Sequence, residues 1–474
     1  MLFEFKNRYK IYYSWLAVRP ALVFLILSLV FGSLFIFRLA PLSGTDEFTH
    51  FPHVYQISEG TYWEQRLPQN QFGGSLPSNI NNMVNAYRNL TRISAGPQYQ
   101  QTETQLNSLY NTLTQPGKTK VTAIFTSTVI YPPWAYTASL LGVMLAKMLK
   151  LPLIWYVYLG RITALLVWIG LTYLAISIIP TGKWFLVALA LLPTSLTQAA
   201  TISSDGMLSG LSWLLIAMVL AILARTIKPS WLKLMSISLL SIYIALIKDG
   251  YFLIGLLPIV IPSKLFINQV LAKVWKLLTL AAVIIVSILF TLRTVHAVKG
   301  VVLTPTIGMY MNSHQQIDYI LHHLISFGLR VLIQPLTKTF DTTYLGIVGI
   351  MTNRLIYLSI LLIFSLYVGL YLGLKHTKPI AYLVEERNKV LLVFLGIFIL
   401  TYGLLATAFY IGNSAVGSTF VNGFYGRYFL PMMPLLMVIP MTLNHRAIAR
   451  TNHYKAAIIL ISIIGLTTTI FSLQ

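Results

Sequence analysis

Carboxylates are scarce in this basic chain, and two of them stand side by side at Asp46 and Glu47, followed closely by His50 and His53. If the stretch is helical, Asp46, His50 and His53 follow the spacing i, i+4, i+7 and share one face. An ionised carboxylate there can act as general base toward a hydroxyl, or help to bind a divalent cation such as Mg²⁺ or Mn²⁺. We therefore predict that Asp46 and Glu47 are catalytic and that the two histidines support them.

A purely structural interpretation of this stretch stays open. Thr45 is a suitable N-cap, which would place both carboxylates in a first helical turn, where the helix dipole stabilises negative charge. The histidines would then be ordinary polar residues of the membrane interface. Pro52 distorts any helix that contains it, so the shared face is only approximate.

A second acidic position is Asp205, in the segment TISSDGMLSG. It is expected at the same face of the membrane as Asp46, where two carboxylates can jointly orient a sugar or a metal ion. Alternatively, Asp205 or one of the two serines before it only caps the helix that follows. Asp318 and Asp341 have no sequence context that singles them out.

Arg427, in the segment NGFYGRYFLPMMP, is the strongest candidate for binding an anion. It opens an apolar segment next to Tyr425, and a guanidinium at headgroup depth can hold a phosphate with two hydrogen bonds. Tyr425 is expected to contribute to substrate binding beside it.

Arg161 lies within an apolar segment, where an unpaired guanidinium is costly. It is expected to bind substrate, to reach the interface with its charged end, or to pair with a carboxylate such as Asp205. Lys248 is a further candidate for substrate binding, and the adjacent Asp249 is expected to pair with it locally. Three other basic residues are secondary candidates: Arg293, Arg330 and Arg354.

These residues must be positioned by membrane-spanning helices. The chain is 56% hydrophobic and 10% charged, with a mean hydropathy of +0.73, and its long apolar runs lack the alternation of barrel strands. We predict an all-α polytopic membrane protein, a single integral domain over residues 1–474, with about eleven transmembrane helices (10–13). The predicted crossings are 20–37, 153–179, 183–200, 206–224, 231–247, 250–263, 277–293, 353–373, 390–411, 428–443 and 456–473.

The placement of Lys and Arg predicts the topology. If the apolar run 131–149 lies along the interface as a juxtamembrane helix, every short basic loop falls in the cytoplasm together with the N-terminus. The first extracytoplasmic loop then covers 38–150, including a polar, irregular cap, and a second large loop covers 294–352. The segments 250–263 and 428–443 are the weakest crossings, and the first is either re-entrant or broken.

Composition also limits the partners and the chemistry. The net charge of +22 is explained by orientation in the plasma membrane and contact with anionic lipids, so no nucleic-acid partner is expected. Cysteine is absent, which excludes disulfides and thiolate nucleophiles. The chain has no P-loop, dinucleotide fingerprint, HExxH or GxSxG motif.

Several motifs occur in an order that resembles a known family. They are the Asp-Glu loop after the first span, YPPxxY from Tyr131, YLGR from Tyr158, ALLPTSLTQAATISSDG and GRYFLP. From about Pro41 to Pro434 the chain resembles the bacterial membrane proteins catalogued as domain of unknown function 2142. Where the commoner pattern of that family has a Pro-Asp-Glu-Pro-like start, this chain has Gly-Thr-Asp-Glu-Phe.

That family is similar in turn to GT-C-type glycosyltransferases, which use polyprenyl-phosphate sugars and place an acidic catalytic residue in the first extracytoplasmic loop. The resemblance implies a GT-C-like arrangement, catalysis by Asp46 or Glu47, and support from Asp205. The expected function is inverting transfer of a sugar from a polyprenyl-phosphate donor to a hydroxyl of a cell-envelope glycan or a similar acceptor. The alternative is a transporter or flippase of lipid-linked sugars.

Overall fold

The computed structural model describes most of the chain. The described residues are 19–68, 71–90, 100–101, 103–105, 107–108, 115–298, 312–339, 356–443 and 453–472. The N-terminus, predicted to be cytoplasmic, lies outside them, as do Asp341, Arg354 and parts of both predicted extracytoplasmic loops.

Six helices of the described chain are long and apolar enough to cross a membrane, which agrees with the predicted class of all-α membrane protein. They are α2 (Pro20–Arg38), α7 (Leu153–Ile178), α10 (Asp205–Leu223), α13 (Gln269–Val298), α18 (Arg387–Asn413) and α20 (His453–Ser472). Shorter apolar helices join them, including α11 (Trp231–Ile247) and much of α16 (Ile356–Lys375).

Three of the predicted crossings are broken into short pieces. Residues 183–200 form α8 (Lys183–Ala190) and α9 (Pro193–Ala199). Residues 250–263 form α12 (Phe252–Gly255), then η4 (Leu257–Val260) and the start of η5 (Ser263–Leu265). Residues 428–443 contain the end of η6 (Gly426–Phe429), then η7 (Met433–Met437) and α19 (Val438–Thr442). Prolines lie in or beside these segments and remove backbone hydrogen-bond donors, which interrupts the helices. Each piece is too short to span a membrane by itself, so the number of crossings stays a prediction.

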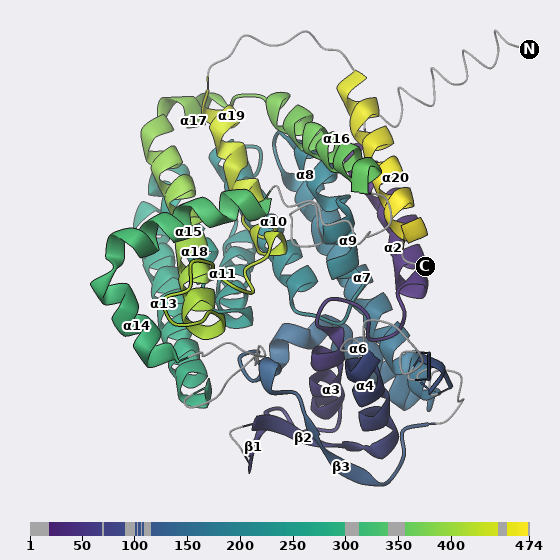
Figure 1. Cartoon of the computed structure of the whole chain (residues 1–474). Helices are drawn as coiled ribbons and strands as arrows, with labels where there is room; N and C mark the ends of the chain where they lie inside the picture. Colours follow the sequence, from purple (N-terminus) through teal and green to yellow (C-terminus); the bar gives the residue numbers. More distant parts are fainter. Residues whose placement is uncertain are drawn as a thin grey trace, which may run out of the picture.

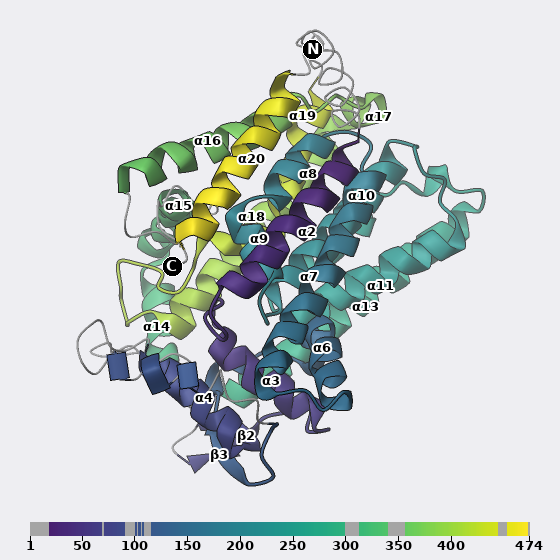
Figure 2. The ribbon, with the colours of Figure 1, turned by 90° about the vertical axis from the view of Figure 1, so that its right-hand side faces the viewer.

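The helices form one bundle around α10, which is buried on almost every side (Figures 1 and 2). It packs on α7, α11 and α9. Its Trp213 indole donates to the carbonyl oxygen of Leu430 at 2.8 Å, which ties it to the segment after η6. The contact joins α10 to a segment 217 residues further along the chain.

A cap covers one end of the bundle (Figure 1). It holds α3 (Glu47–Ser58), α4 (Ser78–Leu90), and an antiparallel sheet of β1 (Gln65–Leu67), β2 (Gln71–Pro77) and β3 (Lys120–Ile124) in that order. In the register of β2 with β3, Gly73 pairs with Ile124. A Cβ on Gly73 would lie 1.8 Å from the carbonyl oxygen of Ala123, so only glycine permits this close approach. The cap was predicted to be irregular, and the sheet corrects that prediction.

The run 131–149 forms η3 (Pro133–Tyr136) and α6 (Thr137–Met148). At 1.5 Å per residue α6 is only about 18 Å long, too short to cross hydrocarbon about 30 Å thick. It packs along α7, with Gly142 against the backbone of Leu159. Its position along the membrane interface stays a prediction from the basic loops. In the second predicted loop, the described residues form the end of α13, then α14 (Ser313–His322) and α15 (Leu324–Thr339).

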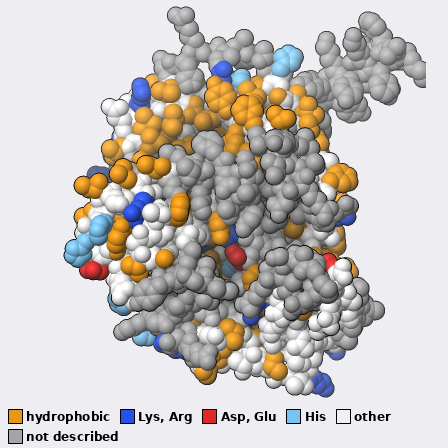
Figure 3. Space-filling view, viewed as in Figure 1, with side chains coloured by type: hydrophobic (Ala, Val, Ile, Leu, Met, Phe, Trp, Pro, Cys, Tyr) orange, Lys and Arg blue, Asp and Glu red, His pale blue; other side chains and the backbone are white. Residues whose placement is uncertain are grey.

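The two ends of the bundle differ. The start of α2 (Figure 2) and the turn around α17 (Ala381–Glu385; Figure 1) lie at the end opposite the cap. Hydrophobic side chains gather over the bundle, whereas uncharged polar surface is frequent over the cap (Figure 3). The assignment of the cap to the extracytoplasmic side remains a prediction from the distribution of Lys and Arg.

Candidate functional site

Asp46 occupies the N-cap position of α3, the place that the sequence suggested for Thr45. Its backbone is left-handed, with φ of 57°, and its side chain makes no capping hydrogen bond. For a residue other than glycine this conformation is unusual, although Asp tolerates it better than most. The carboxylate instead lies at Arg427, with Oδ2 2.7 Å from Nη2, and 53% of the Asp46 side chain is exposed.

Arg427 lies in η6 and is almost fully buried. It also donates from Nη2 to the Tyr428 hydroxyl at 3.0 Å, and the rings of Tyr425 and Tyr428 lie 5.2 and 5.0 Å from its guanidinium carbon. Its Nε is 3.8 Å from Oδ2 of Asp205 and has no hydrogen-bond partner. Arg427 thus joins the two acidic positions and retains an unused buried donor.

Asp205 begins α10, and Lys248 directly follows α11. The Lys248 ammonium donates to Oδ1 of Asp205 at 2.9 Å and lies over the rings of Tyr131 and Tyr428. The predicted pairing of Lys248 with its neighbour Asp249 is wrong, because Asp249 instead accepts a hydrogen bond from Thr291.

We call Asp46, Arg427, Asp205 and Lys248 the charge cluster. Two carboxylates and two cations alternate in it, so its formal charges sum to zero. Burial raises the pKa of the Asp46 carboxyl, but the charge of Arg427 and its hydrogen bond lower this pKa by more. The net result is a pKa below the usual value for Asp. Asp46 is therefore ionised at neutral pH and is reachable from outside the protein.

Glu47 and Arg161 form a separate, completely buried pair. Arg161 Nε donates to Glu47 Oε1 at 2.8 Å and its Nη2 donates to Oε2. The same guanidinium donates to the carbonyl oxygens of Ile36, Leu39 and Ala40 at the end of α2. The pairing partner of Arg161 is thus Glu47 rather than Asp205.

Glu47 also accepts hydrogen bonds from the backbone N–H groups of Gly44 and Ile202. Both of its oxygens are therefore used within the protein. The pair ties the α2–α3 turn to α7 and to the segment before α10, and so fixes Asp46 next to Asp205. In this geometry Glu47 and Arg161 position the site, and Asp46 is the carboxylate that a substrate can reach.

One family model, described as predicted membrane protein (DUF2142), matches residues 29–436. The chain belongs to the DUF2142 family. No curated protein matches this DUF2142 chain, and no solved structure matches it. The matched range includes all four residues of the charge cluster and the Glu47–Arg161 pair, so the family model extends over the whole candidate site.

The two histidines of α3 are buried, and both lie closer to tyrosines than to any carboxylate of the charge cluster. His50 Nδ1 is 2.6 Å from the Tyr136 hydroxyl, and the ring of His53 lies edge-on to Tyr136. Burial lowers the pKa of His50 to about 4, so its imidazole is neutral at physiological pH. His50 can orient or relay a proton beside Asp46, but it does not act there as a cation.

His53 faces a residue that the sequence did not single out, Glu64, with 3.0 Å between Nδ1 and Oε1 and neither side chain exposed. Burial lowers the pKa of His53 to about 3 and raises that of Glu64 to about 7. Both side chains are therefore mostly uncharged between about pH 3 and pH 7. Glu64 lies just before β1 in an unremarkable polar stretch, and only the folded cap buries it.

We predict that Glu64→Gln reduces the loss of stability with rising pH. The folded-state pKa of Glu64 lies above its unfolded value of 4.5, so its carboxyl destabilises the fold progressively as pH rises from about 4.5 to 7. At about 1.4 kcal/mol per pKa unit, the full effect is on the order of 3 kcal/mol above pH 7.

Thermal unfolding of both proteins at pH 5 and pH 8 measures this effect. The gap in melting temperature between the two pH values should be smaller in Glu64→Gln than in the wild type. An equal gap in both proteins would show that Glu64 titrates normally. Glu59→Gln, which alters a partly exposed carboxylate at the end of α3, is the control.

The residues present do not favour the divalent-cation site that the sequence left open at Asp46 and Asp205. Within the described part of the chain, no group of three or more His, Asp or Glu side chains is placed to hold a metal ion. Asp46 and Asp205 each face a cation, Arg427 or Lys248, which occupies the place that a divalent ion would take. No step below involves a metal.

Proposed function

We propose that this protein is an inverting glycosyltransferase that moves a sugar from a polyprenyl-phosphate donor to a hydroxyl of a cell-envelope glycan or a similar acceptor. The observation that carries the proposal is the contact between Asp46 and Arg427 at the cap end of the spans. A carboxylate that can accept a proton thus lies beside a cation that can bind a phosphate. The charge distribution supports an extracytoplasmic site in the plasma membrane.

The reaction assigns a separate role to each member of the charge cluster. Asp46 accepts the proton of the acceptor hydroxyl as its oxygen forms a bond to the anomeric carbon. The bond from that carbon to the phosphate oxygen breaks, and polyprenyl phosphate departs with the electron pair. Arg427 and Lys248 stabilise the negative charge that gathers on this phosphate. Asp205 holds the Lys248 ammonium in place.

Donor binding would also prepare the base. In the free protein Arg427 is paired with Asp46, which lowers the pKa of this carboxyl and weakens it as a base. A donor phosphate that binds the Arg427 guanidinium, whose Nε makes no hydrogen bond in the free protein, would compete with Asp46 for it. The carboxylate would then regain basicity when the acceptor hydroxyl arrives.

The first test measures donor binding. Arg427→Gln should weaken the binding of a polyprenyl-phosphate sugar about 10- to 100-fold, because charge-assisted hydrogen bonds contribute roughly 1.5–3 kcal/mol. Arg427→Lys keeps the charge but loses the planar fork, so it should recover only part of the affinity. Titration of the purified protein with the lipid-linked sugar gives these values.

Lys147→Gln is the matched control for that titration. Lys147 is a basic residue of the cap end, but it binds Glu59 and the Ser58 carbonyl oxygen, away from the charge cluster. Its substitution should leave donor binding unchanged. Wild-type affinity in Arg427→Gln would remove Arg427 from the proposed phosphate site.

A further inference from the structure

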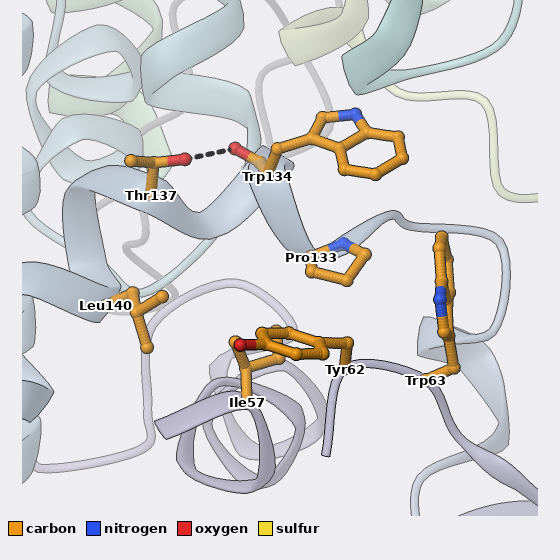
Figure 4. Close-up of a pocket in the computed structure, with 7 residues that line it drawn as sticks. All are labelled: Ile57, Tyr62, Trp63, Pro133, Trp134, Thr137 and Leu140. Atoms are coloured by element: carbon orange, nitrogen blue, oxygen red, sulfur yellow. Dashed lines mark hydrogen bonds between the residues drawn. The ribbon is translucent and has the colours of Figure 1, made fainter. Parts of the chain in front are cut away.

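An apolar pocket lies between the cap and α6, outside the charge cluster. It has a volume of about 320 Å³ and is lined by Ile57, Tyr62, Trp63, Pro133, Trp134, Thr137 and Leu140. The rings of Tyr62 and Pro133 lie on opposite sides of it, Trp63 closes one flank, and Leu140 lies at the other (Figure 4).

Hydrogen bonds hold in place the wall of the pocket that faces the helix bundle. The Trp134 indole donates to the carbonyl oxygen of Leu246, and the Tyr243 hydroxyl donates to the carbonyl oxygen of Trp134. Thr137 Oγ1 is hydrogen-bonded to the same carbonyl oxygen and to Tyr243. The polar groups of this wall are therefore used within the protein, and what they leave for a ligand is an apolar surface.

Exposed apolar side chains also lie on α6, close in sequence to the pocket residue Leu140. Next to Leu140, α6 exposes Leu141, Met144 and Met148, whose spacing places them on one face of the helix. A short helix beside a span, with an exposed apolar face, rests at the boundary between headgroups and acyl chains. The pocket and this exposed face are therefore neighbouring apolar surfaces of the same short helix.

The cationic side chain of Arg293 lies against the Trp63 ring. The guanidinium carbon of Arg293, near the cap end of α13, lies 3.7 Å from the centre of the Trp63 ring. Arg293 Nη1 donates a hydrogen bond to the carbonyl oxygen of Val129 at 3.1 Å. A guanidinium has five N–H donors, so donors remain for a ligand.

Two carboxyls, Glu64 and Asp249, act on Arg293 electrostatically, but neither forms a described salt bridge with it. Burial raises the pKa of Glu64 to about 7, so this carboxyl carries only part of its charge at neutral pH. Asp249 is engaged by the hydrogen bond from Thr291. Arg293 is thus a cation at the membrane interface without a close counter-ion among the described residues, and such residues commonly mark a binding site.

We propose that this pocket and Arg293 form a binding site for an anionic phospholipid of the leaflet on the cap side. The phosphate binds the guanidinium of Arg293, and one acyl chain lies along α6 and enters the pocket between Tyr62 and Pro133. The apolar lining matches the chain, and the cation at Trp63 matches the headgroup. The site does not depend on glycosyl transfer.

Native mass spectrometry of the delipidated full-length protein, titrated with phosphatidylglycerol or phosphatidylcholine, tests the proposal. The wild type should bind phosphatidylglycerol more tightly than phosphatidylcholine. Arg293→Gln should raise the Kd for phosphatidylglycerol about tenfold, because a charge-assisted contact is lost. Leu140→Trp, which fills the pocket, should weaken binding of phosphatidylglycerol even though Arg293 is retained.

Arg330→Gln is the matched control, because Arg330 also lies over an aromatic ring, that of Tyr319, at 5.7 Å. Its guanidinium donates to the carbonyl oxygens of Gly417 and Ser418, whereas that of Arg293 lies over the pocket residue Trp63. The affinity of Arg330→Gln for phosphatidylglycerol should equal that of the wild type. The proposal fails if Arg293→Gln and Leu140→Trp bind this lipid normally, or if the two lipids bind equally well. Effective competition by inorganic phosphate would mean a free-phosphate site and would likewise overturn it. Thermal unfolding of each variant confirms that it is folded.

Discussion

Asp46→Asn is expected to lower the rate of sugar transfer by about 10²- to 10⁴-fold, the usual contribution of a positioned general base. Asn has nearly the same size but cannot accept the proton of the acceptor hydroxyl at neutral pH. Because the donor phosphate is assigned to Arg427 and Lys248, Asp46→Asn should still bind the lipid-linked sugar. Binding should even strengthen, since Arg427 loses a competing carboxylate. Single-turnover transfer with a polyprenyl-phosphate sugar, together with donor titration, measures both effects.

Asp318→Asn controls for the loss of one negative charge, because Asp318 is an exposed carboxylate of α14. It should transfer sugar at the wild-type rate. A normal rate in Asp46→Asn would disprove the assignment of the base. The same experiment distinguishes the alternative function, because a transporter of lipid-linked sugars should move its substrate in Asp46→Asn about as well as in the wild type.

Glu47→Gln is expected to destabilise the protein by about 3–5 kcal/mol, the typical result of removing one partner from a buried ion pair. The Arg161 guanidinium would remain fully buried without its counter-charge, since three carbonyl oxygens of the α2 end would be its main remaining partners. Gln keeps the shape and accepts a hydrogen bond, so the loss is mainly electrostatic. Thermal unfolding in detergent should show a melting temperature several degrees below that of the wild type.

Glu386→Gln provides the comparison, because Glu386 and Lys264 form a largely exposed pair. Pairs of that kind typically contribute less than about 1 kcal/mol, so the melting temperature should barely change. Equal melting temperatures for Glu47→Gln and the wild type would contradict the structural role of the Glu47–Arg161 pair. If Glu47→Gln is stable but inactive, Glu47 acts directly in catalysis, as the sequence first suggested.

Hydropathy and charge were sufficient to predict much of the architecture. Long apolar runs predict membrane-spanning helices because an isolated stretch of apolar residues needs no partner to prefer hydrocarbon. The basic loops also predict that 131–149 is an interfacial helix, and the structure has the 12-residue α6 within this range. The break in 250–263 was predicted from its prolines, and the structure contains it. The break at Pro193, between α8 and α9, was not predicted. The sheet of the cap went unrecognised because its strands are short and rich in polar residues and glycine.

The sequence by itself determined which residues were available for chemistry: few carboxylates, no cysteine, and isolated cations in or beside apolar segments. Only the tertiary structure decided how these residues pair. Asp46 and Arg427 are 381 positions apart, and Glu47 and Arg161 are 114 apart, yet each pair is in direct contact. Adjacent carboxylates therefore have different surroundings: Asp46 is reachable beside the Arg427 guanidinium, and Glu47 is fully buried against Arg161. The physical reason is that burial and the choice of counter-ion depend on how α2, α3, α7 and α10 pack together, and hydrophobic patterning along one segment carries no information about that packing.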